Sequence, residues 1–217
     1  MTTAIEVYSL GLRGDRVWLE GGRPCELPVR DWTGDQLEGD QTLLARCQGP
    51  TLDIGCGPGR LAAALLARRV LALGIDISRE AVAMARARGA AVLQRDVFGS
   101  LPRQGGWQHA LLADGNIGIG GDPIRLLARC RDLLTPTGTV LLDLQGTGAH
   151  LRTDRVRLVA GDLASEWFPW SSLPTGALPA IAAATGFSVQ GIWRSAGRWQ
   201  AELLVSGHWS GAGDASD

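Results

Sequence analysis

Residues 51–60 read Thr-Leu-Asp-Ile-Gly-Cys-Gly-Pro-Gly-Arg, and they indicate the fold more clearly than any other part of the sequence. An apolar run that contains an acid leads into a turn with three glycines, and an alanine- and leucine-rich helix is expected over 60–69. Because glycine has no Cβ, a bulky ligand can approach the backbone of such a turn. The first N–H groups of the helix point back at the turn. The pattern predicts a nucleotide-type cofactor site at the carboxyl end of a parallel strand.

The spacing of the glycines argues against a dinucleotide. A dinucleotide fingerprint reads G-x-G-x-x-G. Here Gly55, Gly57 and Gly59 form G-x-G-x-G, and Arg60 occupies the place of a small residue. Asp53 would repel a pyrophosphate, but it suits a cationic group such as an α-ammonium. We therefore expect a ligand with a positively charged amino-acid end, and a nicotinamide-dependent oxidoreductase is the less favoured alternative.

Residues 53–59, Asp-Ile-Gly-Cys-Gly-Pro-Gly, resemble motif I of the class I S-adenosylmethionine-dependent methyltransferases. The resemblance extends over about residues 50–145. It implies an α/β fold with a Rossmann-like, mostly parallel sheet, helices on both faces and an antiparallel pair of strands near the C-terminal end. It also implies S-adenosyl-L-methionine as methyl donor and S-adenosyl-L-homocysteine as product. The motif I residues implied to bind the cofactor are Asp53, Gly55, Cys56, Gly57 and Gly59.

Two further acids end β-type runs where the family places contacts to the nucleoside. Asp76 follows the glycine turn by roughly the 20 positions expected of an acid that accepts the ribose hydroxyls. The resemblance then places Ile77 against the adenine face. By the same resemblance Asp96 accepts the adenine amine, and the backbone N–H of Val97 binds a ring nitrogen.

The fourth acid, Asp114, opens the sequence Asp-Gly-Asn-Ile-Gly-Ile-Gly-Gly-Asp-Pro. It resembles the family's fourth motif, where a strand end meets the methyl group and the substrate. Four glycines between a strand and a helix form a flexible or close-approach loop, although a plain surface turn is the alternative. We predict that Asn116 orients cofactor or substrate. A single acid at a strand end is usually a cap or loop residue, but four at successive strand ends favour a binding site.

These motifs predict transfer of a methyl group from S-adenosylmethionine to a small-molecule acceptor through an O, N or C nucleophile. The main requirement is to align the nucleophile with an already activated methyl. A general base is needed only if the acceptor must lose a proton. The candidates are His150, shortly after the expected fifth strand, and Asp114 or Asn116 after the fourth. For His150, a solvated loop residue is the competing interpretation. A catalytically degenerate, cofactor-binding regulatory protein is the alternative function; the acceptor and the oligomeric state stay open.

The chain length of 217 residues suits one α/β domain. We place this domain at 50–205, after an N-terminal lid or cap segment at 1–49 and before a flexible tail at 206–217. A hairpin across Gly161-Asp162 is expected as an insertion at 155–168, on the substrate side.

Caps and periodicity locate the other elements. Ser78 and Asp122 are expected N-caps of helices. A buried parallel strand is expected over 139–144. The remaining expected elements are hairpins at 16–29 and 187–205 and helices at 35–47 and 179–185.

Composition narrows the partners and the compartment. The formal net charge is −1 and no basic cluster stands out, so nucleic acid is not an expected partner. No signal peptide or apolar span is present, so no membrane partner is expected. Four cysteines show neither metal nor disulfide spacing, which favours a reducing cytoplasm and no metal. All basic side chains are arginine, which we attribute to a GC-rich, bacterial coding bias.

The chain has eight tryptophans and one tyrosine. We expect most of the tryptophans to be core residues. The exception is Trp167-Phe168-Pro169-Trp170 in the expected insertion, a candidate lining for an apolar pocket that takes a flat or hydrophobic substrate.

Overall fold

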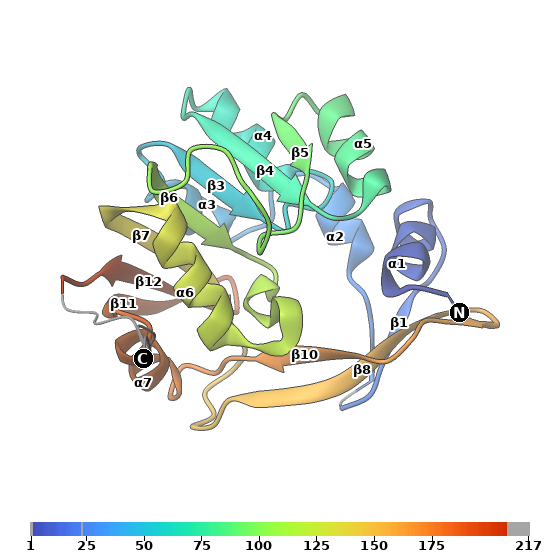
Figure 1. Cartoon of the computed structure of the whole chain (residues 1–217). Helices are drawn as coiled ribbons and strands as arrows, with labels where there is room; N and C mark the ends of the chain where they lie inside the picture. The colour runs from blue at the N-terminus through green and yellow to red at the C-terminus, as the bar shows by residue number, and fades with distance from the viewer. Residues whose placement is uncertain (1, 23, 208–217) are drawn as a thin grey trace, which may run out of the picture.

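The computed structural model describes residues 2–22 and 24–207. A seven-stranded sheet forms the centre, in the order β11-β12-β7-β6-β3-β4-β5 (Figure 1). Its five consecutive strands from β7 to β5 are parallel, and β12 and β11 add an antiparallel edge. The strands are β3 (Thr51–Ile54), β4 (Ala72–Asp76), β5 (Val92–Gln94), β6 (Trp107–Leu112), β7 (Leu134–Leu144), β11 (Phe187–Ser195) and β12 (Arg198–Val205). The predicted fold class is confirmed.

Helices cover both faces of this sheet because its strands are apolar on both sides. Alternate residues of β6 face opposite layers: Ala110 and Leu112 pack with the helices of one face, and Leu111 with those of the other. One layer contains α6 (Pro123–Leu133) and α7 (Leu178–Ala184). The other contains α3 (Asp40–Leu44), α4 (Arg60–Ala67) and α5 (Arg79–Ala87).

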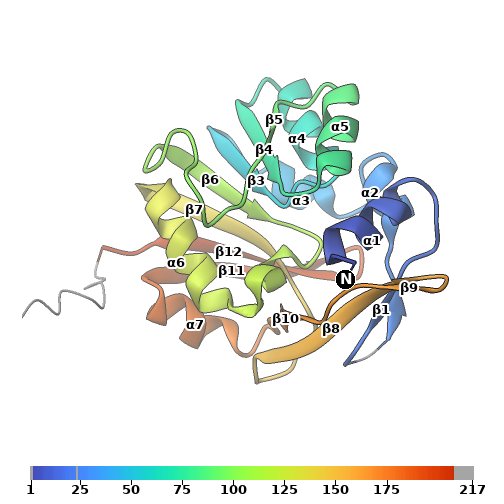
Figure 2. The same cartoon turned by 45° about the vertical axis from the view of Figure 1, so that its right-hand side comes forward.

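A second, antiparallel sheet lies across the carboxyl ends of the parallel strands (Figures 1 and 2). Its order is β10-β8-β1-β2, and β9 also pairs with β8. These strands are β1 (Trp18–Glu20), β2 (Cys25–Glu26), β8 (Arg152–Ala160), β9 (Leu163–Ala164) and β10 (Phe168–Ser172). Since β1 pairs with β8, the N-terminal segment and the expected insertion contribute to one sheet.

Helix α1 (Ala4–Leu12) connects the second sheet with the parallel-sheet unit. Val7 packs with Leu158 of β8, while Leu12 packs with Ala81 of α5. Thr3 caps the helix in a capping box with Glu6. The division at residues 49 and 205 and the lid function of 1–49 remain our proposals.

Several local predictions are confirmed. The Oγ atom of Ser78 accepts a hydrogen bond from the N–H of Ala81, and Asp122 accepts one from Arg125. Strand β7 pairs in parallel with β6 over 139–142, and β11 pairs with β12 across a tight turn. Strands β8 and β9 are joined at Gly161-Asp162, within the expected hairpin. The expected tail was 206–217, and its residues 208–217, which include His208, lie outside the described residues.

Other local predictions were wrong, chiefly before residue 50. The helix expected over 35–47 is limited to α3, because 34–39 contains two glycines that weaken helix formation. A short helix, α2 (Val29–Thr33), begins where the second strand of a hairpin was expected to end. Helix α1 was not predicted, although Thr3-x-x-Glu6 is a capping-box signature.

The tryptophans were also misjudged. Of those that the structure describes, only Trp107 is buried. Trp18 and Trp167 are more than two-fifths exposed, and guanidinium groups lie over their rings. An indole covered by arginine keeps much of its surface away from water without entering the core.

Gly59 and Gly89 provide a matched test of packing at the start of α4. Both have positive φ, but a Cβ on Gly59 would lie 2.7 Å from the Cβ of Ala85, whereas one on Gly89 meets no atom within 4 Å. Gly89→Ala should cost about 1–2 kcal/mol for the left-handed backbone, and Gly59→Ala about 1–3 kcal/mol more because of crowding. Urea denaturation measures both free energies of unfolding, and equal losses would contradict the packing argument.

Candidate functional site

The glycine turn lies at the carboxyl end of β3, the strand between β4 and β6. Gly55, Gly57 and Gly59 all have positive φ (69°, 52° and 82°), so the backbone favours glycine at each of these positions. The turn leads directly into α4, which begins at Arg60. The predicted strand, turn and helix are therefore present.

Asp76 ends β4 and lies beside this turn. Its carboxylate accepts hydrogen bonds from the N–H of Gly57 (2.9 Å) and from the N–H of Ser78 (2.7 Å). Burial raises the pKa of Asp76, while these backbone donors oppose the rise. The side chain thus connects the turn with the N-terminus of α5, at the place predicted to receive the ribose.

Asp53 lies beneath the turn, not on its surface. Its residue exposure is 2%, and among the described residues its Oδ2 atom has no hydrogen-bond partner. Burial, and then the charge of Asp114, raises the pKa of Asp53 to about 7. A buried carboxyl without a full set of partners is an incomplete polar site.

Asp114 follows β6 with φ of 54°, and its side chain is 24% exposed. Its carboxylate accepts from Arg60 Nη2 at 2.6 Å and from Arg198 Nη2 at 3.3 Å. Burial raises the pKa of Asp114, whereas the two guanidinium groups lower it. Of the two acids near the first glycine, Asp114 is the one whose side chain reaches solvent.

The ion network around Arg60 is a feature that the sequence analysis missed. Arg60 also donates to Asp40, whose side chain is fully buried, and Arg198 donates to Asp40 at 2.7 Å and to Asp143. In this network two guanidinium groups face three carboxylates drawn from α3, β7 and the segment after β6. The sequence signal was Arg60 itself, a charged residue where a helix normally packs closely.

Asn116 begins the 3-10 helix η1 (Asn116–Gly121). Its side-chain amide donates to the carbonyl oxygens of Ile54 and Gly55, each at 2.9 Å. A Cβ on Gly55 would lie 2.8 Å from Asn116 Nδ2. Asn116 therefore fixes the glycine turn against η1, and any effect on a ligand acts through that turn.

The predicted adenine contacts lie at the outer part of the same edge. Asp96 is exposed, two residues beyond β5, and accepts from the N–H of Phe98 at 3.0 Å. Val97 is buried, while Ile77 is 51% exposed beside the end of β4. Asp96 and Ile77 are thus accessible to a ligand along this edge.

The histidines occupy different environments. His150 is exposed in the connection between β7 and β8, where it lines a cavity of about 370 Å³. His109 is buried in β6, where its Nδ1 atom lies 2.8 Å from Thr139 Oγ1. Burial lowers the pKa of His109, which suits a neutral structural role.

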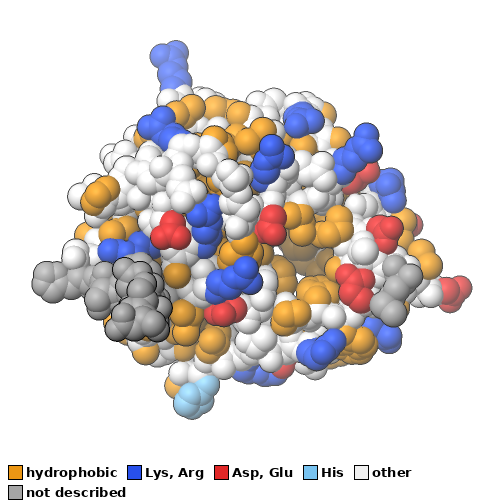
Figure 3. Space-filling view, in the orientation of Figure 1, with side chains coloured by type: hydrophobic (Ala, Val, Ile, Leu, Met, Phe, Trp, Pro, Cys, Tyr) orange, Lys and Arg blue, Asp and Glu red, His pale blue; other side chains and the backbone are white. Residues whose placement is uncertain are grey.

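Tyr8 of α1 was not predicted as a site residue. Its hydroxyl oxygen would lie 3.3 Å from a Cβ on Gly57, so the N-terminal helix reaches the glycine turn. Burial and the nearby Asp76 charge raise the pKa of Tyr8. Figure 3 shows the surface hollowed between the region of α1 and that of η1, with hydrophobic and acidic side chains at its rim.

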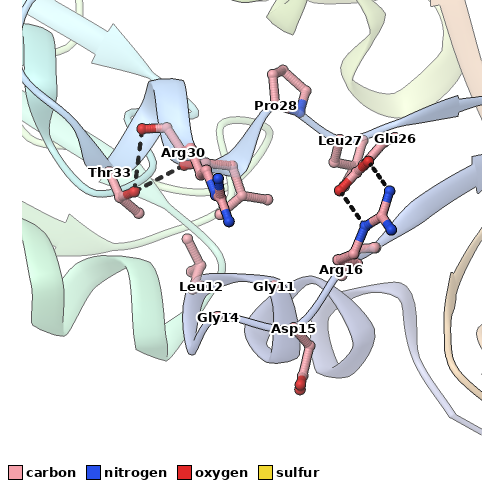
Figure 4. A pocket seen from close by; sticks show the side chains of 12 residues that line it. Gly11, Leu12, Gly14, Asp15, Arg16, Glu26, Leu27, Pro28, Arg30 and Thr33 are labelled. Atoms are coloured by element: carbon pink, nitrogen blue, oxygen red, sulfur yellow. Dashed lines mark hydrogen bonds and ion pairs between the residues drawn. The ribbon is translucent and has the colours of Figure 1, made fainter.

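A larger cavity, about 680 Å³, lies elsewhere, between the end of α1 and α2 (Figure 4). Arg16 and Glu26 form an ion pair at its wall, with 2.7 Å between nitrogen and oxygen. None of the predicted site residues lines it. Among the described residues no cluster of His, Cys, Asp and Glu is arranged to hold a metal ion, and no helix is long and apolar enough to cross a membrane.

Comparison with known families identifies the central unit. Residues 51–138 match the family described as "Methyltransferase domain". Residues 51–138 therefore resemble a methyltransferase domain. This match contains the glycine turn, Asp76, Asp96 and Asp114.

Solved structures with the same fold extend beyond the methyltransferase domain. An S-adenosylmethionine-dependent methyltransferase from Bacteroides fragilis, in complex with S-adenosylhomocysteine, has a TM-score of 0.76 and 24% identity over 94% of this chain and 93% of that one. The 1,6-didemethyltoxoflavin N1-methyltransferase of Burkholderia thailandensis has a TM-score of 0.58 and 17% identity, covering 76% and 74%. An amino pentose methyltransferase from Micromonospora echinaspora has a TM-score of 0.60 and 16% identity, covering 82% and 94%. No curated protein sequence matches significantly.

Asp53→Asn should change the pH dependence of stability. Because the folded-state pKa is raised to about 7, the folded protein binds this proton more tightly than the unfolded chain between about pH 4 and 7. Wild-type stability should therefore fall as pH rises through that window. Between pH 5 and pH 8, the free energy of unfolding of the Asp53→Asn variant should fall by about 1–3 kcal/mol less than that of the wild type.

Urea denaturation at the two pH values measures this difference. Asp132→Asn, which alters an exposed carboxyl on α6, is the control and should follow the wild type. If Asp53→Asn showed the same pH dependence as the wild type, the assignment of a raised pKa to Asp53 would be refuted.

Proposed function

We propose that this protein transfers a methyl group from S-adenosylmethionine to a small-molecule acceptor. The observation that carries the proposal is the glycine turn, connected to Asp76 on one side and to Asn116 on the other. The acids Asp53 and Asp114 lie near its first residues. Such an edge suits a ligand with a nucleoside at one end and an ammonium group at the other.

The residues present fit the cofactor. Asp76 would accept the ribose hydroxyls, in exchange for its present hydrogen bond from the N–H of Gly57. Asp96 and the backbone of Val97 would hold the adenine, with Ile77 against its face. The backbone of Gly55, Cys56, Gly57 and Gly59 would follow the amino-acid end.

Asp114 and Asp53 would supply negative charge opposite the ammonium group at the amino-acid end of the cofactor. Asp114 has the more exposed side chain, so it is the closer candidate for the α-ammonium. Asp53 would contribute from below, since a nearby cation favours its ionised form. This would offset the present cost of burying its carboxylate without a full set of partners.

S-adenosylmethionine supplies a methyl group on a sulfonium: an acceptor lone pair forms the new bond to carbon, and the carbon–sulfur electron pair stays on sulfur. The chain aligns the acceptor and excludes water, an orientation effect that can reach about 7–11 kcal/mol. His150 is our candidate to take the acceptor's proton, and Asn116 our candidate to hold the turn in position.

Two alternatives make different predictions. A nicotinamide-dependent oxidoreductase would place a pyrophosphate on the glycine turn, beside Asp53 and Asp114, where like charges repel. A catalytically degenerate regulatory protein would bind the cofactor but not turn it over. We retain a cytoplasmic location as a proposal, consistent with four free cysteines; the oligomeric state is undetermined.

Titration calorimetry with S-adenosylhomocysteine and with NAD tests the proposal. We expect binding of S-adenosylhomocysteine and none of NAD. Asp76→Ala should weaken binding of S-adenosylhomocysteine by a factor of about ten or more, because a charge-assisted pair of hydrogen bonds is lost. Asp132→Ala, on the exposed side of α6, is the matched control. Preference for NAD, or unchanged affinity in Asp76→Ala, would refute the cofactor assignment.

A further inference from the structure

The cavity of about 370 Å³ lies between the inner face of the second sheet and the chain after β7. Its size is at the lower end of the range for small-molecule sites. We propose that this cavity is the acceptor site, that it takes an uncharged, planar aromatic or heteroaromatic molecule, and that Trp170 determines this specificity. The inference rests on the proposed methyl transfer and adds the substrate class.

The cavity adjoins the cofactor edge through η1. A Cβ on Gly115 would lie 3.0 Å from Gln145 Nε2, and one on Gly118 would lie 2.5 Å from Trp170 Nε1. Both Gln145 and Trp170 line the cavity. Asn116, between the two glycines, holds the glycine turn on the other side. The cavity thus adjoins the same glycine-rich segment that holds the cofactor turn.

The position of Trp170 is fixed from two sides. Phe168 packs edge-on against it, with 6.4 Å between ring centroids, and Gly118 leaves room for the indole by having no side chain. Strand β10 is also attached to η1, because Ser171 Oγ donates to the carbonyl of Gly121 at 2.8 Å. A rigid indole wall favours a flat ligand, since a ring can stack on it with little loss of side-chain freedom.

The charges of the cavity favour an uncharged ligand. Arg152 and Asp154 both line it, and they pair with each other, with 3.1 Å between nitrogen and oxygen. Their opposite charges leave no excess of either sign for an anion or a cation. Gln145 and Ser172 add neutral polar groups, which suit a hydroxyl or a ring N–H.

The step would proceed from a hydroxyl or ring nitrogen of this molecule. Its lone pair bonds to the methyl carbon, the carbon–sulfur bond breaks with its electrons left on sulfur, and the displaced proton goes to His150 or to water. His150 lines the same cavity and is therefore our candidate for the group that accepts this proton.

Binding of matched probes tests the inference in protein saturated with S-adenosylhomocysteine. The probes are 2-naphthol, which is planar and uncharged; 2-decalol, its saturated counterpart; and 2-naphthoate, an anion. Titrations followed by NMR should give at least tenfold tighter binding of 2-naphthol than of either other probe. Equal binding of the three probes would refute the class that we assign.

Trp170→Ala should weaken binding of 2-naphthol at least tenfold. Trp167→Ala is the matched control: this indole is 44% exposed, lies against Arg157 and does not line the cavity, so binding should stay within twofold. Unchanged binding in Trp170→Ala would overturn the role of Trp170. If that variant fails to fold, Leu19→Trp, which fills the cavity from β1, should abolish binding instead.

Binding of S-adenosylhomocysteine distinguishes a failure of the proposed function from a failure of the acceptor inference. If wild-type protein does not bind it, the proposed function fails. If it binds and 2-naphthol does not, the cofactor assignment stands and the acceptor inference alone is wrong.

Discussion

The site depends on compensation of negative charge at one edge of the parallel sheet. Parallel strands end together, so acids placed at successive strand ends come within a short distance of one another. Arg60 and Arg198 neutralise part of this charge by binding Asp40, Asp114 and Asp143. Buried ion pairs contribute little net stability, but removal of one partner leaves an uncompensated charge. The network therefore fixes the start of α4, on which the glycine turn depends.

The same constraint explains why one acid is left incomplete. The arginines reach Asp114 but form no hydrogen bond with Asp53, whose pKa rises to about 7. Full compensation by the protein would remove the attraction for a ligand cation. A protein that leaves one buried carboxyl undersatisfied retains electrostatic free energy that a ligand cation can recover on binding. On our proposal, that cation is the ammonium of the methyl donor.

On our proposal, the second sheet forms the acceptor half of the site. It is assembled from β1 and β2, near the N-terminus, and from β8 and β10, well over a hundred residues later. Since β10 packs against η1, the wall of the 370 Å³ cavity and the glycine turn have fixed positions relative to each other. Catalysis by alignment requires this rigidity, because an acceptor held loosely gains little from proximity.

The sequence by itself determined the central fold, because short-range patterns set it. The apolar runs, the glycine spacing of residues 55–59 and the caps at Ser78 and Asp122 act over a few residues. Only the tertiary structure decided that α1 brings Tyr8 to the glycine turn and that Arg198 joins the network. Pairing of distant strands and compensation of buried charge depend on contacts between residues far apart in the chain. No local periodicity encodes such contacts.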